Sequence, residues 1–182
     1  MPRLAKSLEL IKKTGIQKNG SVIDLGAGAS TLVDDLLDEG FTQLTALDIA
    51  SDSLEISKKR LGVKAKKIKW LEADILKADL PENAFDLWHD RAVFHFLTKP
   101  EDRKVYLEKL GRSLKSGGFV IMASFSLEGP QKCSGLDVQC YSAETMSKEI
   151  GSGFMLVRSD QERHHTPFNT VQDFVYCLFK RA

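Results

Sequence analysis

Acidic side chains and glycines follow the ends of short apolar runs in the first half of the chain. Asp24 begins the segment Asp24-Leu-Gly-Ala-Gly-Ala-Ser30, in which Gly26 and Gly28 permit a tight turn and close approach of a ligand to the backbone. Asp48 ends the next apolar run, and Asp74 follows the third. A carboxylate accepts two hydrogen bonds, which suits the neighbouring hydroxyls of a ribose. These residue types predict a nucleotide-like ligand.

Each of these residues has a structural alternative when it is taken alone. Gly26 and Gly28 match the first two glycines of the dinucleotide fingerprint GxGxxG, but Thr31 stands at the third. Asp48 is also compatible with an exposed turn, and Asp74 with a helix cap, although Asp74 beside the apolar Ile75 would suit the amine and the flat face of a base. The repeated placement of these residues at the ends of successive apolar runs is therefore stronger evidence for a ligand site than any single motif.

A second group of reactive side chains lies in Trp88-His-Asp-Arg-Ala-Val-Phe-His-Phe96. His89, Asp90, Arg91 and His95 offer acid–base and anion-binding chemistry within a short stretch, and we predict them as catalytic candidates. The alternative is an internal Asp90–Arg91 ion pair with His95 on a helix face. His89 or Asp90 would position or deprotonate a substrate, and Arg91 would hold a substrate carboxylate.

The cysteines and the histidines near the C-terminus give weaker indications of a functional site. Cys133 and Cys140 match no zinc spacing and lack a ligand, so no metal is predicted. Glu162, His164, His165 and Gln172 flank a turn that contains Thr166 and Pro167. They are either polar groups of the same site or the solvated tip of a hairpin.

The elements that must position these residues alternate between short apolar runs and amphipathic stretches, which indicates a mainly parallel sheet flanked by helices. In such a sheet the ligand crevice lies at the carboxyl ends of the strands. The last two strands follow each other through a short turn, which favours an antiparallel pair. Asp52 and Glu55 suggest a capping arrangement for a helix that ends near Leu61. The expected strands are 21–25, 44–48, 68–71, 85–89, 119–125, about 154–162 and 171–179; the expected helices are about 3–14, 32–37, 52–61, 101–114 and 142–150, with a long loop over 126–141.

Length and charge exclude several classes of protein. The chain has 182 residues and a formal net charge of +1, with 42% hydrophobic residues, so one domain over 1–182 is expected. The balanced charge argues against a general electrostatic grip on nucleic acid or a membrane, and the lysines within 64–69 are expected on a solvated edge. No apolar run reaches the roughly 20 residues that a membrane helix needs. Three unpaired-looking cysteines and the absence of a secretory signal favour a cytoplasmic protein.

Taken together, the segments resemble the class I S-adenosylmethionine-dependent methyltransferase family. Five stretches match its motifs in order: 22–31, 45–49, 72–75, 85–97 and 114–119. The resemblance implies a Rossmann-like, doubly wound α/β fold with seven strands, mainly parallel, the last antiparallel. It also implies S-adenosyl-L-methionine as cofactor, with S-adenosyl-L-homocysteine as product. The implied cofactor residues are Asp24, Gly26 and Gly28 at the methionyl part, Asp48 and Ile49 at the ribose, and Asp74 and Ile75 at the adenine.

The sequence departs from the family pattern at three places. Ser30 stands at the third glycine of the first motif, and only about twenty residues precede that motif, which leaves closure of the pocket open. The segment after the fourth strand lacks the Asn/Asp-Pro-Pro-Tyr/Phe motif, which argues against methylation of nucleic-acid bases.

We therefore expect methyl transfer to an N, O or S atom of a small-molecule acceptor. The alternatives are a protein-lysine methyltransferase, a nicotinamide-dependent oxidoreductase and a non-catalytic cofactor-binding partner subunit. The sequence does not predict an oligomeric state.

Overall fold

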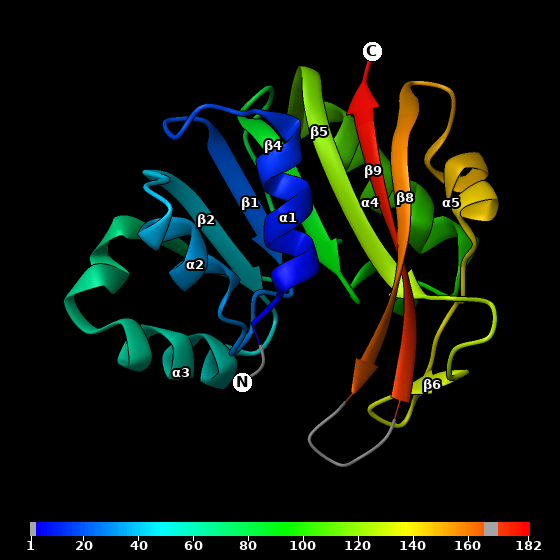
Figure 1. The fold of residues 1–182 in the computed structure, drawn as a ribbon, viewed down its shortest axis with the longest axis horizontal. Helices are drawn as coiled ribbons and strands as arrows, with labels where there is room; N and C mark the ends of the chain where they lie inside the picture. Colours follow the sequence, from blue (N-terminus) through cyan, green and yellow to red (C-terminus); the bar gives the residue numbers. More distant parts are fainter. Residues whose placement is uncertain (1–2, 166–170) are drawn as a thin grey trace.

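A single seven-stranded sheet runs through the computed structural model, which describes residues 3–165 and 171–182 (Figure 1). The strand order is β3-β2-β1-β4-β5-β9-β8, and only β9 runs against its neighbours. The predicted fold class, a doubly wound, mainly parallel sheet with the last strand reversed, is confirmed. The strands are β1 Ser21–Leu25, β2 Gln43–Asp48, β3 Ile68–Glu72, β4 Phe85–Arg91, β5 Leu114–Phe125, β8 Phe154–His165 and β9 Val171–Arg181.

Helices cover both faces of the sheet because its strands are apolar on both sides, as parallel strands usually are. One buried cluster joins α1 and α2 to one face, and the other joins α4 and α5 to the opposite face. None of the described helices is both long enough and apolar enough to cross a membrane. The helices are α1 Ala5–Thr14, α2 Leu32–Asp38, α3 Ser51–Leu61, α4 Pro100–Ser113 and α5 Ala143–Ile150, with the short 3₁₀ helices η1 Gly62–Lys67 and η2 Phe94–Phe96.

Three local predictions change in the structure. Helix α3 begins after Ala50 without a side-chain cap, so the predicted Asp52–Glu55 arrangement is wrong; the Asp48 carboxylate instead accepts a hydrogen bond from the Ala50 amide. The expected loop over 126–141 contains a small hairpin, β6 Lys132–Cys133 and β7 Leu136–Asp137. Strand β4 continues to Arg91 rather than ending at His89. The turn with Thr166 and Pro167 lies outside the described residues.

The topology places the carboxyl ends of β1, β2, β4 and β5 along one edge of the sheet, toward the bottom of Figure 1. The start of α1 reaches the same edge, and the β8–β9 hairpin projects past it. The residues that the sequence singled out at separate strand ends therefore meet at one edge.

Candidate active site

Two adjoining cavities lie at this edge. The larger, about 510 Å³, is bounded by the ends of β2 and β3 and by residues 91–97. The smaller, about 240 Å³, lies against the turn after β1 and the start of α1. Gly26 and Arg91 line both cavities, so these two residues mark their junction. The predicted cofactor residues all line one cavity or the other: Asp24, Gly26 and Gly28 the smaller, and Gly26, Asp48, Ile49, Asp74 and Ile75 the larger.

The two glycines after β1 hold conformations that other residues rarely adopt. Gly26 has φ +60°, and a Cβ atom there would lie 2.3 Å from Cγ2 of Val93. Gly28 has φ +45°, and its Cβ would lie 3.2 Å from Oδ2 of Asp48. Any side chain at either position would be strained, and at Gly26 it would also overlap with Val93. The departure at Ser30 has a local use, because the Ser30 hydroxyl accepts a hydrogen bond from the Leu32 amide at the start of α2.

Asp48 and Asp74 are held by the same local device. In each, Oδ1 accepts a hydrogen bond from the amide two residues along the chain, Ala50 at 2.8 Å and Leu76 at 2.9 Å. This Asx-type turn fixes the carboxylate. Both side chains remain half-buried, and Oδ2 of Asp48 faces Gly28, whereas Oδ2 of Asp74 lies 3.7 Å from the Lys77 ammonium. The turn role and the ligand role are therefore compatible in one residue.

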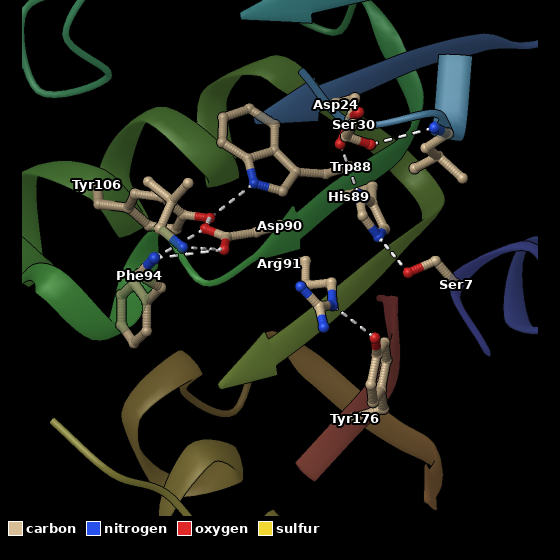
Figure 2. A network of polar contacts seen from close by, with 12 residues as sticks. Ser7, Asp24, Ser30, Trp88, His89, Asp90, Arg91, Phe94, Tyr106 and Tyr176 are labelled. Atoms are coloured by element: carbon tan, nitrogen blue, oxygen red, sulfur yellow. Dashed lines mark hydrogen bonds and ion pairs between the residues drawn. The ribbon is translucent and has the colours of Figure 1, made fainter. Parts of the chain in front are cut away.

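Behind the smaller cavity, Asp24, His89 and Ser7 form a buried chain of hydrogen bonds (Figure 2). His89 Nδ1 lies 2.7 Å from Asp24 Oδ1, and His89 Nε2 lies 2.9 Å from the Ser7 hydroxyl of α1. The second carboxylate oxygen of Asp24 is buried and has no hydrogen-bond partner among the described residues. An orphaned acceptor in a cavity wall needs a donor, and the amino group of a methionyl cofactor would supply one. His89 has both ring nitrogens engaged and is itself buried, so its placement does not support the predicted role as a base.

Asp90 lies on the opposite face of β4 and is fully buried. It accepts hydrogen bonds from the Tyr106 hydroxyl at 2.6 Å and from the amides of Val93 and Phe94 at 2.9 and 3.1 Å. Trp88 in turn donates to the Tyr106 oxygen at 2.9 Å (Figure 2). Burial raises the pKa of Asp90, and burial together with the neighbouring Asp90 charge raises that of Tyr106. Asp90 lines neither cavity, so its placement supports a structural role and not contact with an acceptor.

Arg91 and His95 differ sharply in access. Arg91 lines both cavities, and its Nε donates to the Tyr176 hydroxyl at 2.9 Å rather than pairing with Asp90. His95 is fully buried between the rings of Phe96 and Phe125. Burial, aided by the charge of Arg91, lowers the pKa of His95 to about 4, so its ring is neutral at neutral pH. Of the four predicted catalytic residues, Arg91 alone lines both cavities; His89 lines the smaller cavity, with both of its ring nitrogens hydrogen-bonded.

Sequence reasoning missed the partners of these residues. Ser7, Tyr106 and Tyr176 lie 82, 16 and 85 residues from the side chains that they contact. Tyr176 has the one available signal, a polar hydroxyl inside an apolar strand run. Ser7 and Tyr106 occupy ordinary positions on amphipathic helices and carry no such signal.

Comparison with known proteins adds an independent finding. Residues 23–122 match the family model described as a methyltransferase domain. The chain is 32% identical over 122 residues to a malonyl-[acyl-carrier protein] O-methyltransferase of Anoxybacillus flavithermus, covering 66% of this chain and 44% of that protein. It is 29% identical over 115 residues to EEF1A lysine methyltransferase 2 of Danio rerio, covering 60% of this chain and 49% of that protein. The chain thus spans about half the length of the curated relatives it matches.

Solved structures give the same fold. The N-methyltransferase NodS from Bradyrhizobium japonicum WM9, in complex with S-adenosyl-L-homocysteine, superimposes with a TM-score of 0.73. The superposition covers 97% of this chain and 85% of that one, at 17% identity. At this identity the likeness supports the fold alone.

Proposed function

The chain belongs to the family of methyltransferase domains, and from that premise we propose that it transfers a methyl group from S-adenosyl-L-methionine to an N, O or S atom of a small-molecule acceptor. The observation that carries the proposal is that three carboxylates around the two adjoining cavities each have an oxygen available to accept a hydrogen bond from a ligand. Asp24 offers a buried oxygen that has no hydrogen-bond partner within residues 3–165 and 171–182, and Asp48 and Asp74 each keep one oxygen outside their Asx-type turns.

The residues of the cleft fit the cofactor group by group. Asp48 and Asp74 would accept hydrogen bonds from the ribose and the adenine, while the apolar Ile49 and Ile75 flank them in the same cavity. Gly26 and Gly28 keep the backbone open to the ligand, and Asp24 would accept from the methionyl amino group. When bound, the cofactor supplies a methyl group on a positively charged sulfur, which is already a good leaving group.

The protein's own contribution is then alignment and exclusion of water, because none of the predicted catalytic residues presents a free base at the junction of the cavities. His89 has both nitrogens hydrogen-bonded, and His95 is buried and neutral. Asp90 has its carboxylate occupied. We expect an acceptor atom that carries an available lone pair at neutral pH, such as a carboxylate, an aromatic amine or a thiolate.

Protein lysine is the second candidate acceptor, because one matched relative is a lysine methyltransferase. A screen with cofactor that carries a labelled methyl group separates the two. The protein is incubated with a metabolite pool and, separately, with a protein extract. Label in the small-molecule fraction supports the proposal, and label confined to protein supports the alternative.

Matched variants make the screen specific. Asp48→Ala removes the proposed ribose ligand, whereas Asp52→Ala removes an exposed aspartate four positions away that lines neither cavity. Transfer should fall in the first variant and persist in the second. Equal methyl transfer by the two variants would show that Asp48 is not part of the cofactor site.

A further inference from the structure

Arg91 occupies the junction of the two cavities with part of its guanidinium unused. Its Nε donates to the Tyr176 hydroxyl, and its guanidinium carbon lies 4.2 Å from the centre of the Phe174 ring. Its Nη2 atom is buried and has no hydrogen-bond partner among the described residues. The side chain is 17% exposed. The guanidinium is therefore firmly oriented, yet it keeps donors for something else.

The nearest counter-charge stops short of satisfying those donors. Oε2 of Glu162 lies 4.0 Å from Nη2 of Arg91, beyond hydrogen-bond distance, and that oxygen already accepts a hydrogen bond from Tyr176 at 3.0 Å. Glu162 thus balances the charge without completing the hydrogen bonds. Because Nη2 is buried, the carboxylate of an acceptor would reach it by displacing the side chain of Glu162, and a carboxylate placed there can form paired hydrogen bonds with a guanidinium.

Charge in the cleft adds a reason for an anionic occupant. The two cavities meet at Gly26 and Arg91, so a cofactor that occupied both cavities would carry its positively charged sulfur near these residues. Two positive charges at close range repel each other. An acceptor that brings a negative charge relieves this repulsion, whereas the ammonium of a lysine increases it.

We propose that Arg91 selects the acceptor by binding a carboxylate on it, and that Glu162 stands in for that carboxylate while the acceptor is absent. This inference rests on the proposed function and narrows it to carboxylate-bearing acceptors. Arg91 is the residue that binds the carboxylate; Tyr176 and Phe174 are positioning residues, since their contacts fix the orientation of the guanidinium.

The test uses succinate as a dicarboxylate probe and succinamide as its uncharged counterpart. Both are titrated calorimetrically, at constant ionic strength, into the full chain saturated with S-adenosyl-L-homocysteine. Succinate should bind and succinamide should bind at least ten-fold more weakly. Arg91→Met should weaken succinate binding by about ten-fold or more, the size expected when a charge-assisted hydrogen bond is lost.

Glu162→Gln provides a second variant with the opposite expected sign. The amide oxygen keeps an acceptor for Tyr176 but removes the competing charge, so succinate should bind several-fold more tightly. Arg158→Met is the matched control, because Arg158 is also paired with a β8 carboxylate, Asp160, but lines neither cavity. It should leave succinate binding unchanged.

Several results would overturn the proposal. Succinate that fails to bind the wild-type complex, or that binds Arg91→Met equally well, removes the carboxylate site. A Glu162→Gln variant that binds succinate less tightly contradicts the substitute role. A loss of S-adenosyl-L-homocysteine affinity in Arg91→Met, with succinate binding unchanged, assigns the guanidinium to the cofactor. Failure of the wild-type protein to bind S-adenosyl-L-homocysteine is a different result, because it refutes the proposed function itself.

Discussion

Asp48 at the end of β2 and Asp90 near the end of β4 are the same residue type close to the same edge of the sheet, yet their surroundings differ. Asp48 is half-buried, uses one oxygen in a turn and leaves the other facing the cleft. Asp90 is fully buried and has three donors on its carboxylate. We therefore expect burial and the number of occupied lone pairs, rather than residue type, to distinguish a ligand-binding aspartate from a structural one. Changing the first should affect ligands, and changing the second should affect folding.

The largest expected effect is on stability. Asp90→Ala leaves the Tyr106 hydroxyl and the amides of Val93 and Phe94 without their acceptor, and each unsatisfied buried donor costs roughly 1–3 kcal/mol. We expect the free energy of unfolding, measured by denaturant titration, to fall by about 3–5 kcal/mol. The molecules that remain folded should bind S-adenosyl-L-homocysteine within a few-fold of the wild type. A stable variant that has lost methyl transfer would instead return Asp90 to the catalytic machinery.

His95 extends the comparison to pH. Its pKa is lowered from 6.5 to about 4, so the neutral ring stabilises the fold fully above pH 6.5. This contribution is lost as the pH falls from about 6.5 to about 4, because the unfolded chain then binds a proton that the folded protein excludes. The loss amounts to up to about 3 kcal/mol at about 1.4 kcal/mol per pKa unit.

The His95→Leu variant isolates this effect. The free energy of unfolding of the wild type should decline more steeply than that of the variant between pH 6.5 and 4, with kcat at neutral pH retained. Parallel pH profiles for the two proteins would show that the ring is accessible to protons, and would reopen its predicted role in acid–base chemistry.

For Asp48 the expected change in free energy is smaller than for Asp90, and it affects ligand binding rather than folding. Asp48→Ala should weaken S-adenosyl-L-homocysteine binding by about ten- to a hundred-fold, because charge-assisted hydrogen bonds to the ribose contribute roughly 1.5–3 kcal/mol each before desolvation. Stability should change by about 1 kcal/mol or less, the contribution of a single turn hydrogen bond. Calorimetric titration and thermal melting on the same samples separate the two quantities. A variant with a much lower melting temperature but unchanged affinity for S-adenosyl-L-homocysteine would give Asp48 a structural role, like that expected of Asp90.

The smallest expected effect is on stability and comes from Ser7→Ala. This variant tests the contact between α1 and His89 of β4. Ser7→Ala leaves Nε2 of the buried His89 without its partner, so unfolding should become easier by about 1 kcal/mol. The exposed Ser152, changed to alanine, serves as the control in the same thermal melts. Identical melting temperatures for the two variants would mean that the Ser7–His89 contact adds nothing to the attachment of α1.

The same contrast explains how far the sequence predicts this molecule. The apolar runs indicate every strand of the main sheet, and the carboxyl-end rule brings the cofactor candidates to one edge. Asp48 and Asp74 are accessible to this reasoning because their supporting hydrogen bonds reach only two residues along the chain. The roles of the residues in the predicted catalytic cluster cannot be predicted in this way. Strand β4 extends to Arg91, and His89 and Asp90 find their partners, only through tertiary packing. A polar run such as His89-Asp90-Arg91 does not reveal which of its members face solvent.

The most direct test of the central claim is a calorimetric comparison of ligands for the cleft. S-adenosyl-L-homocysteine and S-adenosyl-L-methionine should each bind the wild-type protein at a single site, bind Asp48→Ala more weakly and bind Asp52→Ala as they bind the wild type. NAD should give no saturable signal. Saturable binding of NAD, with no signal from either S-adenosyl compound, would contradict the assignment of the cleft.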